Sequence, residues 1–208
     1  MEILVDNWGA LWYDPPDNRN EQEEMTMEQT AGKLRAGDLT YIGIFAALMA
    51  VCAWISIPAA VPFTLQTLGV FLAVGLLGGR RGTLAVLVYI LLAAVGVPVL
   101  AGFQGGVGAL LGNTGGYVLG FLLSALAMWA VERLWGRSVW ALGAGMLLGL
   151  VLCYAFGTAW FFYLYTRSTG PVALQVVLGW CVVPFLIPDL CKIAAALLLT
   201  RRLGRHIK

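Results

Sequence analysis

Charged side chains are scarce over most of this sequence. Of its 208 residues, 12% are Asp, Glu, Lys or Arg, whereas soluble domains carry about 25%. Hydrophobic residues make up 60% of the chain, and the mean hydropathy is +0.84. Water is therefore a poor solvent for most of the chain, and the composition predicts an integral membrane protein.

Residues that hold metals or drive hydrolysis are almost absent. The chain has one histidine, His206, and its cysteines fall in apolar segments at spacings that match no metal site: Cys52, Cys153, Cys181 and Cys191. We expect no metal and no other cofactor, and we interpret the cysteines as small core side chains. No GxxxxGK[ST] phosphate loop is present, so any ATP-driven step must be performed by another polypeptide. No nucleic-acid partner is expected.

Acidic residues are missing from the apolar part of the chain. Eight of the eleven precede Gly32, and beyond Asp38 only Glu132 and Asp189 remain. Residues 1–37 are therefore a separate polar segment, which predicts a disordered cytoplasmic N-terminal arm. The arm has no apolar stretch before a small-residue cleavage site, so it is not interpreted as a secretory signal.

Six apolar runs are candidates for crossing roughly 30 Å of hydrocarbon, which needs about 20 residues each. The predicted spans are Leu39 to Ile57, Pro62 to Gly78, Gly82 to Val95, Gly115 to Trp135, Val139 to Tyr165, and Val172 to Thr200. The third is short alone and is expected to continue into GVPVLAG. The sequence thus predicts an all-α transmembrane domain of six helices at residues 38–203, followed by a basic cytoplasmic tail at 204–208.

Basic residues gather at alternate junctions between these runs. They precede the first span, join the second to the third and the fourth to the fifth, and follow the sixth: Lys33, Arg35, Arg80, Arg81, Arg133, Arg137, Arg201, Arg202, Arg205 and Lys208. The other side has Arg167 alone. By the positive-inside rule, both termini are predicted to lie in the cytoplasm.

Two opposite charges interrupt the last apolar run. Asp189 and Lys192 are three residues apart, so on a helix they share one face and can reach one ligand or each other. A charge in mid-membrane costs roughly 2.5–3.5 kcal/mol on insertion scales, so it persists where it is used or paired. The pair is predicted to bind substrate; the alternative is an ion pair that only locks the helices together.

Residues 96–117 contain eight glycines in GVPVLAGFQGGVGALLGNTGGY. Irregular backbone at membrane depth is tolerated only when it is buried in protein or lines a cavity. We therefore predict a re-entrant loop that caps an external cavity, with close glycine-mediated helix packing as the alternative.

A polar cluster opens the second predicted span. Thr64, Gln66 and Thr67 lie in VPFTLQTLGV, and the Gln66 amide suits a neutral polar ligand group, although it could equally bond neighbouring backbone. Tyr117 opens the fourth span, where it could contact a ligand or belong to an interfacial aromatic belt.

Three segments together are distinctive: VPFTLQTLGVFLAVGLLGGRRG, GVPVLAGFQGGVGALLGNTGGYVLGF and IPDLCK. In order and spacing they resemble the biotin-specific substrate-binding (S) component of energy-coupling-factor (ECF) vitamin transporters, the BioY family. The resemblance covers about Leu39 to Arg202. Asn113 departs from the proline expected in the family's GPTGGY stretch; it is a candidate ligand-contacting residue or an incidental helix N-cap.

The resemblance implies a prokaryotic plasma-membrane protein with the S-component fold, which captures extracellular biotin. Its implied partners are a transmembrane coupling subunit and two cytoplasmic ATPase subunits, so the chain itself is not expected to be an enzyme. Some family members are also thought to act without a dedicated energising module. Ala46 and Ala50, in an AxxxA spacing, resemble the family's docking face for the coupling subunit.

Biotin also fits these residues chemically. An ionised Asp189 would accept hydrogen bonds from the ureido N–H groups, and Lys192 would neutralise it and donate to the ureido carbonyl. The opposite pose, with Lys192 on the valerate carboxylate, stays open. Pro184 and Pro188 are expected to break the helix just before the pair and deepen the pocket. The candidate walls for the rings are Phe63, Phe103, Tyr117 and Trp160.

Three other functions remain open from the sequence. One is an S component for a different vitamin. Another is a self-sufficient secondary transporter in which Asp189 couples uptake to protons, although no obvious paired repeat supports it. The third is a membrane enzyme using Asp189 and Lys192 as acid and base, which lacks a nucleophile or metal.

Overall fold

The computed structural model describes residues 34–204. The chain divides into two compact parts, Met1–Ala36 and Gly37–Lys208. The predicted N-terminal arm and basic tail fall almost wholly outside the described residues.

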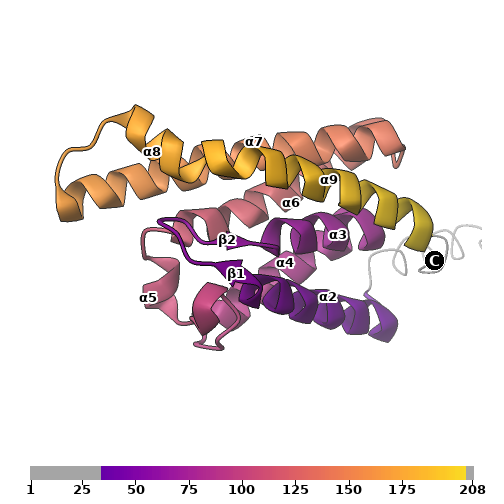
Figure 1. The fold of residues 1–208 in the computed structure, drawn as a ribbon. Helices are drawn as coiled ribbons and strands as arrows, with labels where there is room; N and C mark the ends of the chain where they lie inside the picture. The colour runs from indigo at the N-terminus through magenta and orange to yellow at the C-terminus, as the bar shows by residue number, and fades with distance from the viewer. Residues whose placement is uncertain (1–33, 205–208) are drawn as a thin grey trace, which may run out of the picture. The chain divides into compact units, whose positions relative to one another are not determined.

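Helices dominate the described part of the chain (Figure 1). The long ones are α2 (Ala36–Trp54), α3 (Gln66–Leu77), α4 (Gly79–Ala94), α6 (Gly115–Trp135), α7 (Val139–Thr169) and α9 (Val183–Leu203). Three shorter helices are η1 (Ala101–Phe103), α5 (Val107–Leu110) and α8 (Leu174–Cys181).

Within residues 34–204, four stretches are long and apolar enough to cross a membrane: Ala36–Trp54, Gly115–Trp135, Val139–Thr169 and Leu174–Leu203. The second and third predicted spans form α3 and α4, which have only 12 and 16 residues. At about 1.5 Å per residue, each is shorter than the hydrocarbon layer. Non-helical backbone of the β1–β2 hairpin precedes α3, and glycine-rich backbone follows α4.

A small antiparallel hairpin joins α2 to α3, a feature that the sequence analysis did not predict. β1 (Ser56–Ile57) pairs with β2 (Phe63–Thr64), with Ser56 opposite Thr64. The first predicted span ends at Ile57 and the second begins at Pro62. Both predicted spans therefore include residues that form the hairpin. Pro58 contributes to the difference at the first span, because a proline disfavours helical backbone at the residue before it, Ile57.

The α6 and α7 helices lie side by side, and glycines permit their close approach (Figure 1). A Cβ added at Gly157 of α7 would lie 2.3 Å from Cδ1 of Tyr117 on α6, and one at Gly149 would lie 2.3 Å from the Ser124 hydroxyl. Each clash would force the helices apart. The absence of these two side chains therefore sets the distance between α6 and α7, and with it the position of the Tyr117 ring.

The last predicted span is broken, as expected, but not at a proline. Val182 separates α8 from α9 with non-helical angles (φ −124°, ψ −56°), Pro184 lies in the first turn of α9, and Pro188 lies inside that helix. Proline is well tolerated in a first turn because the missing N–H would be unpaired there in any case. The break therefore precedes the Asp189–Lys192 pair by nearly two helical turns.

Charged residues hold the turns at one end of the helices. Glu132 accepts a hydrogen bond from the backbone N–H of Gly79 at the start of α4 (2.6 Å) and pairs with Arg137 (3.4 Å). Arg137 in turn donates to the Gly75 carbonyl of α3 (2.8 Å). The α3–α4 turn and the α6–α7 turn therefore share one end of the molecule.

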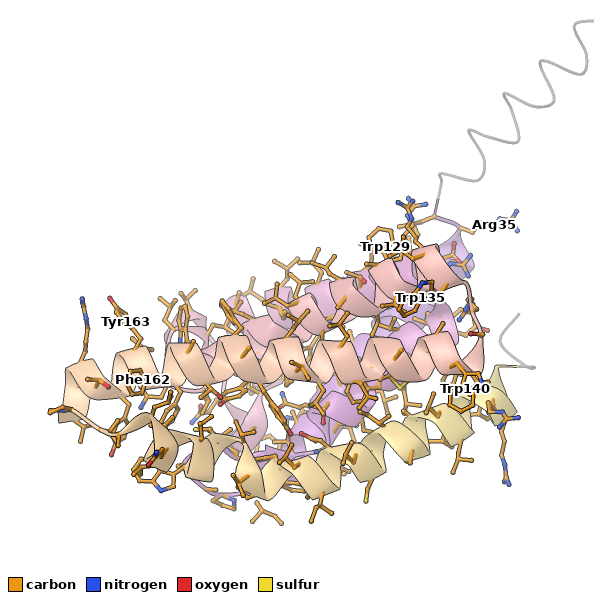
Figure 2. The ribbon with its side chains drawn as sticks, turned by 90° about the horizontal axis from the view of Figure 1, so that it is seen from above. Arg35, Trp129, Trp135, Trp140, Phe162 and Tyr163 are labelled. Carbon is orange, nitrogen blue, oxygen red and sulfur yellow. The ribbon has the colours of Figure 1, made fainter. Side chains whose placement is uncertain are left out.

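The aromatic residues labelled in Figure 2 mark both ends of the long helices. Trp135 and Trp140 lie at the end with the charged turns, and Phe162 and Tyr163 lie at the opposite end of α7. The exposed fractions of Trp135 and Trp140 are 67% and 89%. Amphipathic aromatic rings are enriched where a membrane meets water, so these positions suit the two interfaces of a spanning helix.

Candidate binding site

A cavity of about 210 Å³ lies at the end of the molecule away from the charged turns, among α3, α6, α7, α9, the β1–β2 hairpin and the glycine-rich segment. Its walls are mainly apolar, as small-molecule sites usually are. The polar residues that line it are Ser56, Thr64, Gln66, Thr67, Gln104, Thr114, Tyr117, Tyr154, Asp189 and Lys192.

Asp189 and Lys192 form a buried ion pair at the wall of this cavity. The Lys192 Nζ lies 2.7 Å from the Asp189 Oδ1, and the two residues are 3% and 6% exposed. Their spacing of three residues on α9 turns both side chains to the same face, as the sequence predicted. Removing one member of a buried pair leaves an uncompensated charge and typically costs about 3–5 kcal/mol.

Protein groups accept all three Lys192 N–H bonds and donate to both oxygens of Asp189. Lys192 also donates to the backbone carbonyl of Thr64 (2.6 Å) and to the Thr67 hydroxyl (3.2 Å). The Thr67 hydroxyl donates to Asp189 Oδ1 (3.0 Å), and the Tyr154 hydroxyl donates to Asp189 Oδ2. The pair therefore connects α9 with the hairpin, α3 and α7, and these hydrogen bonds offset part of its desolvation cost.

Gln66 lines the cavity and is also held by protein groups. Its amide nitrogen donates to the Tyr89 hydroxyl (2.5 Å), and its amide oxygen accepts from the Thr64 hydroxyl (3.0 Å). The Tyr89 hydroxyl in turn donates a hydrogen bond to the Val99 carbonyl in the glycine-rich segment (3.0 Å). Gln66 thus ties α3 to α4 and to that segment while it faces the cavity.

Tyr117 lines the cavity from α6 and is 8% exposed. Its hydroxyl lies 2.9 Å from the Thr158 hydroxyl of α7, and its ring lies against the bare backbone at Gly157. The structure therefore brings Asp189, Lys192, Gln66 and Tyr117 together at one cavity.

The other four predicted binding residues lie outside the cavity lining. Phe63 lies behind it: its ring is stacked on Phe185, which does line the cavity, and is 4.4 Å from the Lys192 Nζ. Phe103 is 64% exposed and stacks on Trp54. The Trp160 indole donates to the carbonyl of Gly112 (3.0 Å).

Asn113, the fourth of these residues, is exposed. The N-cap of α6 is Thr114, so Asn113 is not the helix N-cap that the sequence analysis offered as an alternative.

Two residues at the ion pair were missed from the sequence. Thr67 was noted as part of a polar cluster but not as a partner of Asp189, and Tyr154 was not singled out at all. One signal was available for Tyr154, because it is the middle residue of the 31-residue α7. Tyrosine in membrane helices favours the interfaces, so a tyrosine at mid-span is expected to have a buried hydrogen-bond partner.

The glycine-rich segment contributes one wall of the cavity through Leu100, Ala101, Gly102, Gln104, Ala109 and Thr114. Gly102 and Gly106 have positive φ angles of 67° and 89°, which residues with a Cβ rarely adopt. A hydrogen bond from the Trp54 indole to the Pro98 carbonyl (2.9 Å) anchors the segment to α2. The segment lines the cavity, and close glycine packing also occurs within it, since a Cβ at Gly116 would lie 2.3 Å from the Cβ of Trp160.

Ala46 and Ala50 do not form an exposed docking face on α2. They are 1% and 5% exposed and belong to the core. Two exposed small residues near the middle of the same helix, Gly43 and Ala47, are also four apart.

The described residues include no group of three or more histidine, cysteine or acidic side chains that could hold a metal ion. Cys52, Cys153 and Cys181 are buried, as predicted, whereas Cys191 is exposed. Cys153 and Cys181 line the cavity.

Comparison with known proteins gives a consistent result. The sequence model of the BioY family matches residues 24–208. The chain is 43% identical to the biotin transporter BioY of Thermotoga maritima over 164 residues, 78% of this chain and 93% of that protein. It is 36% identical to the biotin transporter BioY of Rhodobacter capsulatus over 179 residues, covering 81% and 94%.

A solved structure agrees with these sequence matches. The crystal structure of the S-component for biotin from an ECF-type ABC transporter superposes with a TM-score of 0.73 and 27% identity, covering 84% of this chain and 96% of that one. With its four apolar spans, the chain is a prokaryotic membrane protein, and it belongs to the BioY family of transporter proteins.

Proposed function

We propose that this protein is the biotin-binding S component of an ECF-type transporter, which captures biotin from outside the cell for uptake with partner subunits. The observation that carries the proposal is the buried Asp189–Lys192 pair at the wall of an apolar cavity. Family membership and the structural likeness to a biotin S-component support the same ligand.

The cavity suits the bicyclic part of biotin. Asp189 offers an anionic acceptor for the ureido N–H groups, and hydrogen bonds of this kind are roughly twice as strong as neutral ones. The aromatic residues that line the cavity are Tyr117, Phe121, Tyr154 and Phe185. These rings, in place of Phe103 and Trp160, are the proposed walls for the fused rings of the ligand.

The valerate carboxylate is proposed to lie away from Lys192. Lys192 is the sole cation among the residues that line the cavity, and it is already paired with Asp189. Neutral polar groups of the hairpin and the glycine-rich segment, at Ser56, Gln104 and Thr114, line other parts of the wall. Placing the carboxylate there avoids burying a second anion beside Asp189.

We further propose six membrane crossings with both termini in the cytoplasm and the cavity facing outward. The charged turns support this orientation, since Arg81, Arg137 and Arg201 lie in or beside the α3–α4 turn, the α6–α7 turn and the end of α9. Cationic residues accumulate on the cytoplasmic side of membrane proteins. The short α3 and α4 helices would complete their crossings with hairpin and glycine-rich backbone sheltered by the other helices.

Energy is proposed to come from a coupling subunit and two ATPase subunits. The exposed small residues Gly43 and Ala47 make one face of α2 the proposed contact for the coupling subunit, in place of Ala46 and Ala50. Small side chains four residues apart let two helix backbones approach closely within a membrane.

The decisive experiment is equilibrium binding of radiolabelled biotin to the purified full chain, compared with thiamine and riboflavin. Biotin is expected to bind at least a hundredfold more tightly than either. Equal or tighter binding of another vitamin would refute the proposed ligand. Uptake that requires a pH gradient, and loses that requirement in Asp189→Asn, would favour a proton-coupled carrier instead.

A further inference from the structure

The two oxygens of the Asp189 carboxylate have different partners. Oδ1 accepts hydrogen bonds from Lys192 (2.7 Å) and from the Thr67 hydroxyl (3.0 Å). Oδ2 accepts one from the hydroxyl of Tyr154, which reaches it from α7. One side of the carboxylate thus carries a cation and a hydroxyl, and the other carries a single phenol.

Tyr154 belongs to the cavity wall as well as to the ion-pair network. It is half-buried and lines the cavity together with Asp189. A tyrosine has one hydroxyl proton, and here that proton is directed to Oδ2. The lone pairs of the phenol oxygen therefore remain as acceptors, and a carboxylate oxygen can accept a second hydrogen bond beside the first.

The cationic side of the site is engaged by the protein. The Lys192 ammonium has three N–H bonds, and its three acceptors are Asp189 Oδ1, the Thr64 carbonyl and the Thr67 hydroxyl. A ligand carbonyl that approached Lys192 would have to displace one of them. A ligand N–H that approached Oδ2 would displace none.

We propose that Tyr154 is a positioning residue that holds Asp189 Oδ2 toward the cavity, so that the site selects ligands by their N–H donors and not by their carbonyl. This inference rests on the proposed function and deepens it, since it names the part of the ligand that is recognised. It replaces the sequence-based expectation that Lys192 donates to the ureido carbonyl.

A purely structural role for Tyr154 is the alternative to be tested. The same hydrogen bond ties α7 to α9, and losing it could loosen the helices without any effect on recognition. The two roles differ in how they treat different ligands. A structural defect weakens every ligand equally, whereas loss of a positioned acceptor weakens only those ligands that donate to it.

The test compares Tyr154→Phe with Tyr163→Phe, which makes the same change on the same helix at a residue that is 54% exposed. The probes are biotin, its two derivatives methylated at one ureido nitrogen, and 2-thiobiotin, which keeps both N–H groups but has a weaker acceptor. Dissociation constants are measured by calorimetry on the purified full chain, and thermal midpoints are recorded for each variant.

The unaltered protein should prefer biotin to at least one N-methyl derivative by more than tenfold, and 2-thiobiotin should lose less than fivefold. In Tyr154→Phe, biotin should weaken about tenfold, while that N-methyl derivative changes less than twofold. Tyr163→Phe should leave every dissociation constant within twofold. An equal loss for all ligands in Tyr154→Phe, or no loss, would overturn the inference, as would a larger penalty for 2-thiobiotin than for N-methylation.

A double-mutant cycle supplies an independent readout. In the Asp189→Asn background, Tyr154→Phe should weaken biotin less than twofold, because no carboxylate is left to position. A full tenfold loss in that background would show that Tyr154 acts independently of Asp189. Failure of the unaltered chain to bind biotin would refute the proposed function and this inference together, whereas normal biotin binding with an unaffected Tyr154→Phe would refute the inference alone.

Discussion

The two ends of the molecule are built in different ways. On one side of the cavity the backbone forms a short hairpin and a glycine-rich segment, and side chains hold it by hydrogen bonds to its carbonyls, as Trp54 does at Pro98 and Lys192 at Thr64. At the opposite end, short turns connect regular helices, and charged side chains such as Glu132 and Arg137 hold the turns. Irregular backbone lets one end shape a pocket, and the other end keeps the helices in place.

This comparison is tested most strongly by Asp189→Ala. We expect biotin affinity to fall by more than tenfold, because the ureido acceptor is lost and Lys192 remains buried without its partner. The free energy of unfolding should fall by about 3–5 kcal/mol. Calorimetric titration and denaturant unfolding measure the two effects.

The double variant Asp189→Ala/Lys192→Met is the control for this prediction. Removing both charges should recover most of the lost stability without recovering binding. Unchanged affinity in a folded Asp189→Ala protein would show that the pair is only structural. The ion pair at the cavity would then only hold helices together, as Glu132 and Arg137 do at the opposite end.

A matched pair on α2 separates buried from exposed positions. Ala47→Leu should leave biotin binding and thermal stability unchanged but reduce uptake several-fold in cells that supply the coupling subunits, because bulk on the exposed face keeps two helices apart. Ala46→Leu should instead destabilise the protein by about 1–3 kcal/mol through overpacking. The reverse pattern, with normal stability and impaired uptake only in Ala46→Leu, would restore the original docking face.

A smaller effect is expected where side chains hold the glycine-rich segment. Trp160→Phe removes the hydrogen bond to the Gly112 carbonyl while keeping an aromatic ring. Biotin should dissociate about two- to fourfold faster, in line with the lower part of the range of roughly 0.5–1.5 kcal/mol for the net value of a neutral hydrogen bond. Trp140→Phe, at an 89% exposed residue of the opposite end, is the control and should change nothing. Stopped-flow measurements of both variants distinguish these outcomes.

The smallest effect on binding is predicted at the charged end. Glu132→Gln weakens the pairing with Arg137, in which the arginine and glutamate side chains are 50% and 20% exposed, and it alters the acceptor for the Gly79 N–H. Screening by solvent limits the loss of stability to about 1 kcal/mol, while the dissociation constant of biotin should stay within twofold. A loss of affinity larger than the loss of stability would show that the two ends are coupled.

The charges at the centre of the site were predictable because Asp189 and Lys192 stand alone in an apolar run. Their hydroxyl partners were not, since a tyrosine or threonine in a membrane helix is ordinary until its neighbours are known. Helix α2 shows a further limit. It is hydrophobic nearly all round. Its sequence therefore shows small residues four apart but does not indicate which face of the helix is buried in the core.

The aromatic residues show why the walls of the site were only partly predicted. Phe103 and Trp160 come from the expected segments, but the Phe103 ring stacks on Trp54 at the surface and the Trp160 indole holds the Gly112 carbonyl. Contacts with other elements decide where each ring lies. The hairpin was missed for a different reason. Strands of two residues have no periodicity to detect, and only the proline at position 58 indicated that the helix had ended.

The strongest anchor of Lys192 outside its ion pair is a main-chain oxygen, that of Thr64. A carbonyl is common to all amino acids, so exchanging the residue at position 64 would alter the contour of the pocket without removing the acceptor that steadies the ammonium group. Libraries aimed at accepting bulkier vitamin analogues can therefore vary this position first and keep this contact of the Lys192 ammonium.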